Sequence, residues 1–287
     1  MKISNSQIAD FQKCERRFYY AHMLDLRARD YPEPLKRGID GHALFEVALK
    51  FRMENPEAPY ENCVSSLNAL IEEYVTEGNQ LGLSVYRHVI AFIARVYEEE
   101  WEVVSVERNV LSETPCDDIE FAWTADVVFR WTKGPKRGRL FMLDWKFTAQ
   151  QWNDVQIAMH QQLFKYMSYW NQENPEDKIG HVGIVNLLTR AAQGEVASKL
   201  FAIKWQTVNK DKIARIDFEN DILIQRVAVA KSTWAPEQFV RTNDSYACKM
   251  CMFANDICPA ELEGRSIEKY LQVNYVKNTY FSDNYGD

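Results

Sequence analysis

The spacing of hydrophobic positions along the chain changes near residue 101. Before this point apolar residues recur every three to four positions, which is the spacing of amphipathic helices. This pattern predicts helices over residues 3–25, 35–53, 61–78 and 83–100. Beyond it, alternating segments predict strands over 101–110, 119–132, 138–147, 179–188 and 198–205, with helices over 153–172 and 208–231. Ser4 or Ser6 could cap the first helix.

The order of these elements predicts an α/β fold with a mixed central sheet flanked by helices. Helices precede the sheet, and a cysteine-bearing cap follows it. We interpret residues 1–272 as a single domain with a helical insertion at about 54–100. The remaining residues, 273–287, are polar and aromatic, and we expect them to form a loosely ordered tail.

The composition is that of a globular protein that can bury a large core, because 46% of its 287 residues are hydrophobic. A net charge of -7 disfavours a passive nucleic-acid coat protein but not an enzyme that acts on nucleic acid. No apolar stretch approaches the roughly 18 residues of a membrane span, and the first residues lack a signal-peptide core. We therefore expect a cytoplasmic protein that is neither secreted nor bound to a membrane.

An acid and a lysine follow four apolar residues in the segment 140–146. Asp144 and Lys146 point to the same face of an extended strand, because successive side chains alternate. Asp126 lies in the preceding alternating segment and Glu107 in the one before it. Carboxylates and a lysine gathered on neighbouring strands are what metal-assisted phosphodiester cleavage requires. The simpler alternative is a structural ion pair or solvated strand ends, and buried acids on consecutive strands disfavour it.

His42 and two residues of a later helix are weaker candidates. Gly38 precedes His42 by about one helical turn, and we expect this glycine to let the helix approach another backbone closely. This context makes His42 a candidate metal ligand, although a lone helical histidine more often makes an ordinary hydrogen bond. Gln162 and Tyr166 are also one turn apart. They indicate either a polar edge that orients the lysine or the DNA phosphates, or ordinary amphipathicity.

Three cysteines near the C-terminus have the short spacing of thiolates that share a metal: Cys248, Cys251 and Cys258. They need a fourth ligand to hold tetrahedral zinc or an iron–sulfur cluster, and Cys14 is the natural donor. Pro259 after the last cysteine is typical of iron–sulfur sites. Zinc in place of iron and buried thiols without a ligand are the alternatives.

Taken in order, these residues resemble the RecB-type nucleases of the PD-(D/E)XK superfamily. The likeness is greatest to its iron–sulfur branch, which includes CRISPR-associated exonucleases and AddB-type nuclease domains. The matching segments are F-x-x-C-x-R-x-F-Y-Y at 11–20, G-x-x-x-H at 38–42, D-x-K at 144–146, Q-x-x-x-Y at 162–166 and the cysteines at 248, 251 and 258. Two departures are Trp123, where the family usually has glycine, and a last cysteine gap one residue longer than usual.

The resemblance implies a restriction-endonuclease-like fold and phosphodiester hydrolysis with Mg2+ or Mn2+. It implies metal ligands at His42, Asp126, Asp144 and the Trp145 carbonyl, with Glu107 supporting a second ion. Lys146 would position water or stabilise phosphate charge, and orienting or DNA-binding roles would fall to Gln162, Tyr166 and Arg16. A structural 4Fe–4S cluster would be held by Cys14, Cys248, Cys251 and Cys258.

On this basis we expect a DNA exonuclease that acts on single strands or duplex ends. One alternative is a processing subunit of a recombination or CRISPR-adaptation complex, with a recombination or helicase protein as partner. Others are a non-catalytic nucleic-acid-binding module and a zinc-stapled interaction protein. Cleavage polarity, the preference for DNA over RNA, endonuclease against exonuclease action, and oligomeric state do not follow from the sequence.

Overall fold

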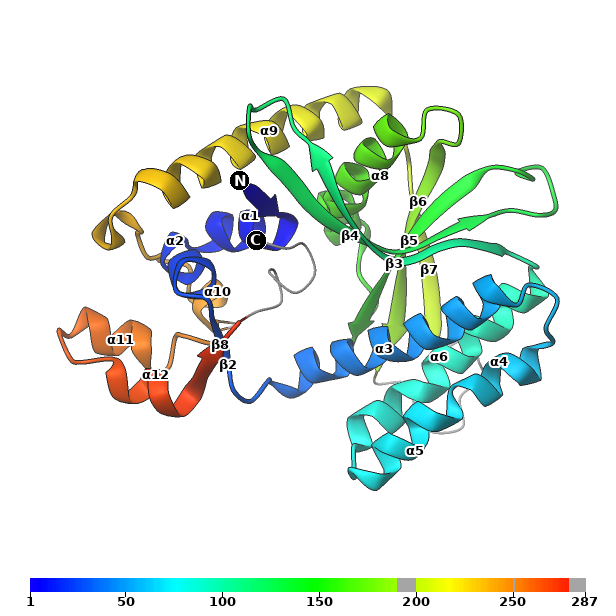
Figure 1. Cartoon of the computed structure of the whole chain (residues 1–287), viewed down its shortest axis with the longest axis horizontal. Coiled ribbons are helices and arrows are strands. Elements are labelled where there is room, and N and C mark those ends of the chain that lie inside the picture. The colour runs from blue at the N-terminus through cyan, green and yellow to red at the C-terminus, as the bar shows by residue number, and fades with distance from the viewer. Residues whose placement is uncertain (190–199, 250, 279–287) are drawn as a thin grey trace. The chain divides into compact units, whose positions relative to one another are not determined.

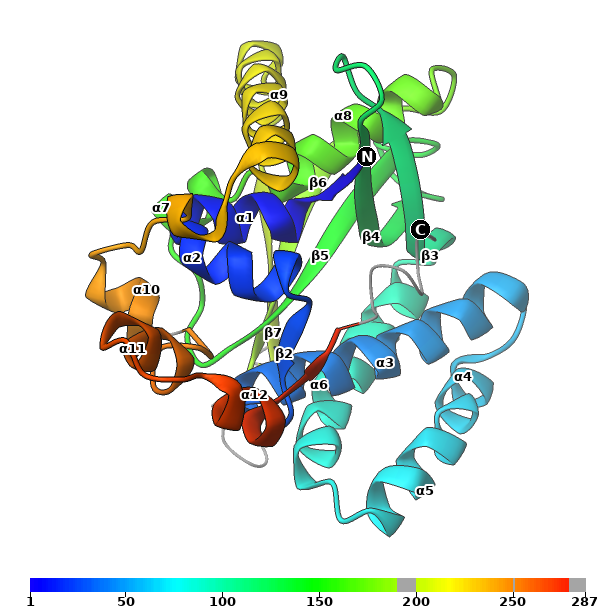
Figure 2. The ribbon, with the colours of Figure 1, turned by 60° about the vertical axis from the view of Figure 1, so that its left-hand side comes forward.

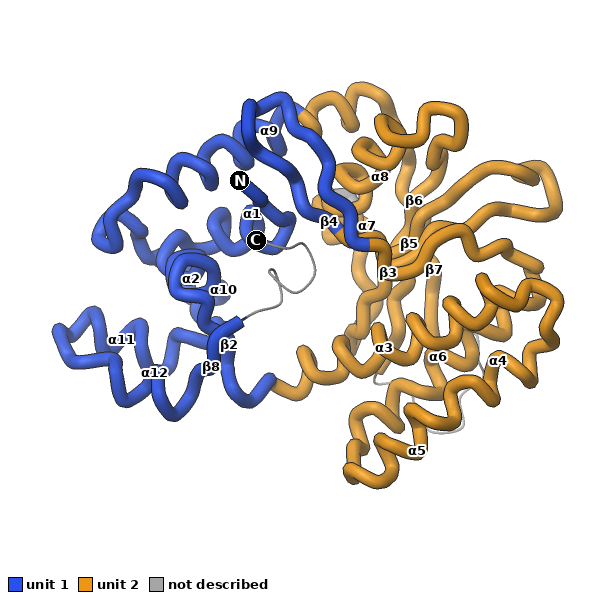
Figure 3. The backbone as a smooth tube through the Cα atoms, in the orientation of Figure 1, with its two compact units in different colours: residues 1–31, 109–123, 218–287 blue, residues 32–108, 124–217 orange. Residues whose placement is uncertain are grey.

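The computed structural model of the chain describes residues 1–189, 200–249 and 251–278. Its backbone divides into two compact units, shown in different colours in Figure 3. Unit 1 comprises residues 1–31, 109–123 and 218–287, and unit 2 comprises residues 32–108 and 124–217. The single domain expected over 1–272 stays a prediction.

Unit 2 is built on a mixed sheet, as the order of elements predicted. Its strands are the first part of β3 (Glu102–Glu113), the second part of β4 (Glu120–Arg130), β5 (Leu140–Thr148), β6 (Ile179–Leu188) and β7 (Phe201–Gln206). β5 pairs antiparallel with β4 and parallel with β6, and β6 pairs antiparallel with β7. The parallel β5–β6 pair requires a crossover, which contains α7 (Asp154–Met159) and α8 (Gln162–Glu173).

Two long helices cover one face of this sheet (Figure 1). The helices of unit 2 before the sheet are α3 (Glu33–Glu54), α4 (Tyr60–Ser66), α5 (Asn68–Thr76) and α6 (Gln80–Glu98). Phe45 of α3 stacks on Trp145 of β5 with 4.2 Å between ring centroids, and Phe92 of α6 meets the same indole edge-on at 4.9 Å. Because Trp145 lies in this core, Asp144 and Lys146 point to the opposite face of β5.

Unit 1 contains the N-terminal helices and the C-terminal cap (Figure 2). Its elements are β1 (Lys2–Ser4), α1 (Asn5–Lys13), α2 (Glu15–Phe18), the π-helix η1 (Tyr19–Met23), β2 (Leu26–Ala28), most of α9 (Lys210–Thr233), η3 (Pro236–Gln238), α10 (Ser245–Lys249), α11 (Ile257–Leu262), α12 (Glu268–Asn274) and β8 (Tyr275–Lys277). β1 pairs in parallel with residues 120–122 of β4, and β2 pairs antiparallel with β8.

The first predicted helix, over 3–25, is wrong in two respects. Residues 2–4 form a strand, and the helical run that follows is interrupted at Cys14, whose backbone is extended. Ser4 is the N-cap of α1, and its hydroxyl and Gln7 form a reciprocal capping box. The apolar spacing was correct for α1, since Ile8 and Phe11 are buried, but periodicity does not register a single extended residue.

Three other boundaries differ from the sequence prediction. The predicted helix 61–78 is two helices that meet at Leu67, and the predicted helix 153–172 is interrupted at His160 and Gln161. The tail predicted from residue 273 includes the end of α12 and β8, whose Tyr275 packs in the core of unit 1. Residues 198–199 and 279–287 lie outside the described residues. No described helix is long and apolar enough to cross a membrane.

Candidate active site

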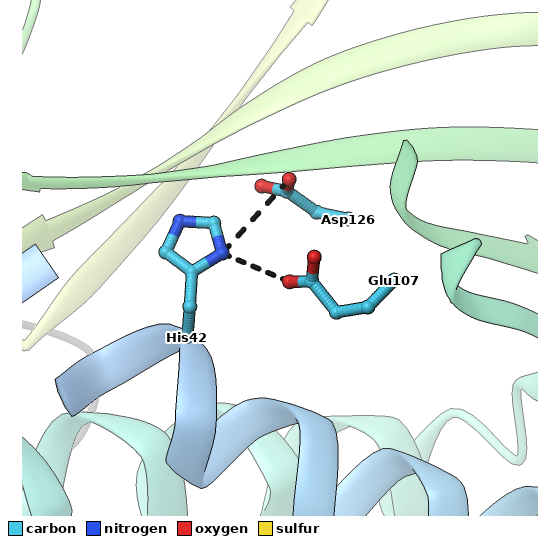
Figure 4. Close-up of side chains that lie close together, drawn as sticks. All are labelled: His42, Glu107 and Asp126. Carbon is cyan, nitrogen blue, oxygen red and sulfur yellow. Dashed lines mark hydrogen bonds and ion pairs between the residues drawn. The ribbon is translucent and has the colours of Figure 1, made fainter. Parts of the chain in front are cut away.

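A histidine and two carboxylates from three different elements meet in unit 2 (Figure 4). His42 of α3, Glu107 of β3 and Asp126 of β4 each offer one ligand atom, and these atoms all lie within 4.8 Å of one another. The Nδ1 atom of His42 is 2.9 Å from Oε1 of Glu107 and 4.0 Å from Oδ1 of Asp126. The sequence predicted all three as site residues, and the structure brings them together.

A glycine lets α3 reach the sheet at this point, but it is Gly41 and not Gly38. A β carbon at Gly38 would meet no atom within 4 Å, so the close approach expected there does not occur. A β carbon at Gly41 would lie 1.9 Å from the ring of Phe147, one residue after Lys146. Gly41 therefore allows the helix to lie against β5, and its neighbour His42 extends toward the carboxylates.

Glu107 has a backbone conformation that residues other than glycine rarely adopt. Its φ angle is +42°, in the left-handed region, within a strand. The alternation predicted for this strand fails at the same place, because the adjacent residues Ser105 and Val106 are both buried. Strained backbone of this kind is maintained by its surroundings and is concentrated at functional sites. In this protein the strained residue is Glu107 itself, whose carboxylate contacts His42.

Asp126 and Asp144 are connected through the backbone of β5. The Oδ2 atom of Asp126 accepts a hydrogen bond of 2.8 Å from the Trp145 amide, which fixes the rotamer of the carboxylate and leaves Oδ1 on the side of His42. Asp144 is only 2% exposed, and its Oδ2 atom lies 2.5 Å from Nζ of Lys146. The acid and lysine of the D-x-K segment thus form an ion pair on the face that the strand alternation predicted.

The charges of the site perturb one another strongly. Burial opposes the charged form of His42, but the carboxylates of Asp126 and Glu107 outweigh it and raise the pKa of His42 to about 9. Burial, followed by the charge of Asp144, raises the pKa of Asp126 to about 7. Burial also opposes the charge of Lys146, yet Asp144 and Asp126 raise the pKa of its ammonium group. Perturbed groups gathered in this way are typical of functional sites.

These donors fit a hard divalent cation. Carboxylate oxygens suit Mg2+ and Mn2+, and an imidazole nitrogen is acceptable to Mn2+. The three ligand atoms already lie close enough to share one ion. A bound cation would also replace the protons that the free site holds, since ligands must be deprotonated to bind.

We predict that the affinity for Mn2+ rises with pH. Between about pH 7 and 9 His42 must lose its proton to act as a ligand, so affinity should increase by about tenfold per pH unit. Below pH 7 Asp126 must also be deprotonated, and the slope should steepen. Calorimetric titration with Mn2+ at several pH values measures this directly. His42→Gln should remove the slope above pH 7, and a flat profile in the unaltered protein would contradict the assignment.

The second predicted pair, Gln162 and Tyr166, lies at the start of α8. The side-chain amide of Gln162 donates a hydrogen bond of 3.1 Å to the Tyr166 hydroxyl, so the two residues act as one polar unit on the helix. Their roles in orienting Lys146 or DNA stay predictions, as does that of the Trp145 carbonyl as a metal ligand.

Sequence reasoning missed His160, which precedes α8. Its Nε2 atom lies 3.9 Å from Oδ2 of Asp144, and burial lowers the pKa of the ring to about 4. The ring also meets the Trp152 indole edge-on at 5.2 Å. The sequence offered one indication of this role, because His160 lies two residues before the Q-x-x-x-Y segment. The predicted helix 153–172 is interrupted at His160, and this interruption lets the side chain lie near Asp144.

The predicted metal-binding cysteines lie in unit 1, at a cavity of about 640 Å3. Its lining includes Cys14, Cys248, Cys251 and Cys258. The Thr242 amide donates to Sγ of Cys14, and Nε of Arg241 donates to Sγ of Cys258 at 3.3 Å. Cys14 reaches this cavity from the extended break between α1 and α2, the feature that the helical prediction overlooked.

Arg16 is a buried residue beside the same cavity. It is 7% exposed and forms an ion pair with Glu261, with further hydrogen bonds to Tyr20 and the Pro236 carbonyl. In this position it ties α2 to α11. The orienting or DNA-binding role that the resemblance implies for Arg16 stays a prediction.

Comparison with known protein families identifies the fold. The family model of the PD-(D/E)XK nuclease superfamily matches residues 2–259. The chain belongs to this superfamily. The mixed sheet with flanking helices is accordingly its restriction-endonuclease-like fold, as the sequence predicted. PD-(D/E)XK nucleases use divalent metals, and the group formed by His42, Glu107 and Asp126 could bind one.

Two solved structures are similar to this PD-(D/E)XK chain. One is a candidate exonuclease from Eubacterium rectale, with 13% identity and a TM-score of 0.47, covering 91% of this chain and 92% of that one. The other is the protein SSO0001, with 16% identity and a TM-score of 0.36, covering 90% of this chain and 86% of that one. No match to the chain was found among curated proteins.

Proposed function

We propose that this PD-(D/E)XK nuclease is a metal-dependent deoxyribonuclease that removes nucleotides from single-stranded DNA or duplex ends. The observation that carries the proposal is the group of His42, Glu107 and Asp126, together with the Asp144–Lys146 ion pair on the adjacent strand. Carboxylates that can hold a cation and a lysine that can face a phosphate are the requirements of phosphodiester hydrolysis. Exonuclease action on DNA is taken from the family resemblance.

The acidic residues and His42 would bind the cation, and the basic Lys146 would act on the phosphate. When bound, a divalent cation polarises the scissile phosphate and lowers the pKa of water. His42, Glu107 and Asp126 would hold that cation, and Asp144 would contribute a carboxylate from β5. Lys146, kept positively charged by its neighbours, would stabilise the charge that develops on the phosphate, an effect worth several kcal/mol in such sites.

Digestion of end-labelled DNA tests the function. We expect Mn2+ or Mg2+ to support degradation of linear single strands, while circular single strands persist. Asp126→Asn should abolish the reaction, because it removes a ligand charge at the centre of the site. Asp177→Asn is a matched control, since Asp177 pairs only with Arg130 in the described contacts and lies on a turn. Cleavage of circular DNA would contradict exonuclease action, and absence of any cleavage would overturn the proposal.

We further propose that the four cysteines of unit 1 hold a structural 4Fe–4S cluster. Four thiols at one cavity are the donor set that such a cluster needs. Tetrahedral zinc on the same four thiols is the alternative.

Metal analysis of protein purified without oxygen tests the cluster. We predict a brown protein with about four irons per chain. Cys258→Ser should lose the iron and lower the melting temperature, because cluster binding contributes to folding. Cys116→Ser is the control, because Cys116 is not one of the four proposed ligands. This variant should keep the iron content of the unaltered protein. Zinc in place of iron would contradict the assignment.

A further inference from the structure

A buried asparagine on β6 has a hydrogen-bond donor that no described residue uses. Asn186 has no exposed surface, and its Oδ1 atom accepts a hydrogen bond of 3.2 Å from the Trp152 amide. Its Nδ2 atom has no hydrogen-bond partner within the described part of the chain. Buried polar groups are nearly always paired, and leaving one unpaired lowers stability. The hydrogen bond from Trp152 satisfies the side-chain oxygen of Asn186, and the burial of the NH2 group requires a different explanation.

The register of the sheet pairs Asn186 with Lys146. β5 and β6 are parallel, and Asn186 is the partner of Lys146 across the pair. Residues paired across neighbouring strands extend to the same face of a sheet, and the strands themselves lie about 4.8 Å apart. The neighbouring Val185 and Leu187 lie in the hydrophobic core on the other face. Asn186 is therefore on the same face as Lys146 and Asp144.

The hydrogen-bond chemistry specifies what this position can bind. A backbone amide can only donate, so the atom that faces Trp152 must be the side-chain oxygen, and the unpaired atom must be the NH2 group. That group and the Lys146 ammonium are both donors. Two neighbouring donors, one of them cationic, are complementary to an anionic oxygen and repel a metal cation. The acids on the other side of Lys146 provide the cation site, so the two ligands would lie side by side.

We propose that Asn186 binds a non-bridging oxygen of the substrate's phosphodiester backbone beside Lys146. This inference rests on the proposed nuclease function and adds to it a substrate-contacting residue on β6. A further atom of the region without a hydrogen bond among the described residues is Nε2 of His160, which is 3.9 Å from Oδ2 of Asp144. His160 also contacts Trp152, whose amide orients Asn186. The segment that precedes α8 thereby sets the direction of the donor.

Asn186→Asp is the informative variant. It keeps the oxygen that accepts from Trp152 and replaces the NH2 donor with a negatively charged acceptor. Binding of a short single-stranded oligonucleotide is measured by fluorescence anisotropy in Ca2+, used in place of Mg2+ to limit cleavage. We expect the variant to bind the oligonucleotide at least about tenfold more weakly, because a charge-assisted hydrogen bond is lost and a repulsion is introduced.

Neutral methylphosphonate linkages, placed one at a time, identify the phosphate. In the unaltered protein one position should weaken binding by about tenfold, and in Asn186→Asp the same substitution should cause no further loss. Equal methylphosphonate penalties in both proteins at every position would overturn the inference. If the unaltered protein neither binds nor cleaves DNA, the proposed function itself fails, which is a distinct result.

Asn171→Asp provides the matched control. The Asn171 amide is used on both sides, accepting from the Ile179 amide at 2.6 Å and donating to the Ile179 carbonyl at 3.1 Å. Its replacement should lower the melting temperature and leave oligonucleotide affinity unchanged. Weakening of binding by both variants to the same extent would assign the Asn186 effect to general destabilisation and overturn the inference.

Discussion

Replacing Lys146 with alanine is expected to reduce the rate of DNA cleavage by about a hundredfold or more. The ammonium group is kept charged by Asp144 and Asp126, and a charge at this position is most useful when negative charge develops on the phosphate. Mn2+ binding should persist, because the lysine is not a ligand. Cleavage of labelled DNA and calorimetric titration with Mn2+ measure the two properties separately. Normal cleavage by the variant would remove Lys146 from the mechanism.

Stability must be separated from chemistry in this test. Lys146→Ala leaves the carboxylate of Asp144, which is 2% exposed, without its partner, and breaking a buried pair can cost about 3–5 kcal/mol. The double variant Asp144→Asn with Lys146→Met removes both charges, and we expect it to recover stability without recovering cleavage. Lys50→Ala is the control, because Lys50 lies on the exposed side of α3 and pairs with Glu46. It should cleave normally.

Gly41→Ala is expected to lower the affinity for Mn2+ by about tenfold to a hundredfold, although Gly41 is not a ligand. The added methyl group would overlap the Phe147 ring, so either the ring or α3 must move. Movement of α3 shifts His42 away from Glu107 and Asp126. Overpacking of this kind also costs about 1–3 kcal/mol of stability. Calorimetry with Mn2+ and thermal unfolding report the two effects.

Two variants make this prediction specific. Gly38→Ala introduces the same methyl group on the same helix where nothing lies within 4 Å, and it should raise stability by about 0.5–1 kcal/mol with unchanged Mn2+ affinity. Gly41→Ala combined with Phe147→Ala removes the overlapping ring and should restore Mn2+ binding. If Gly41→Ala binds Mn2+ as the unaltered protein does, the helix–strand contact does not position His42.

Local patterns were a good guide wherever the structure depends on local geometry. Alternation along β5 predicted that Asp144 and Lys146 share a face, because successive side chains of a regular strand point to opposite sides. The capping residue Ser4 was one of two candidates, since a reciprocal cap involves only four neighbouring residues. Pattern reasoning failed at Cys14 and at His160–Gln161, where one or two residues interrupt a helix without disturbing the apolar spacing.

The site also contains features that depend on distant segments. The sequence suggested a close approach at Gly38, whereas the close approach is at Gly41, because the decisive neighbour is Phe147 on a strand far along the chain. The left-handed backbone of Glu107 has no sequence signature, since glutamate is not a residue that favours it. Asn186 became a candidate only through the β5–β6 register.

The sequence by itself determined the order of the main helices and strands, the mixed sheet and the charged residues of the candidate site. These follow from periodicity and from the cost of burying acids on strands. Only the tertiary structure decided which glycine lets α3 approach β5, which carboxylates lie near His42, and which side-chain amide, on the residue paired with Lys146, lacks a partner among the described residues. Those properties depend on pairing register and on contacts between residues far apart in the chain, and no local pattern records either.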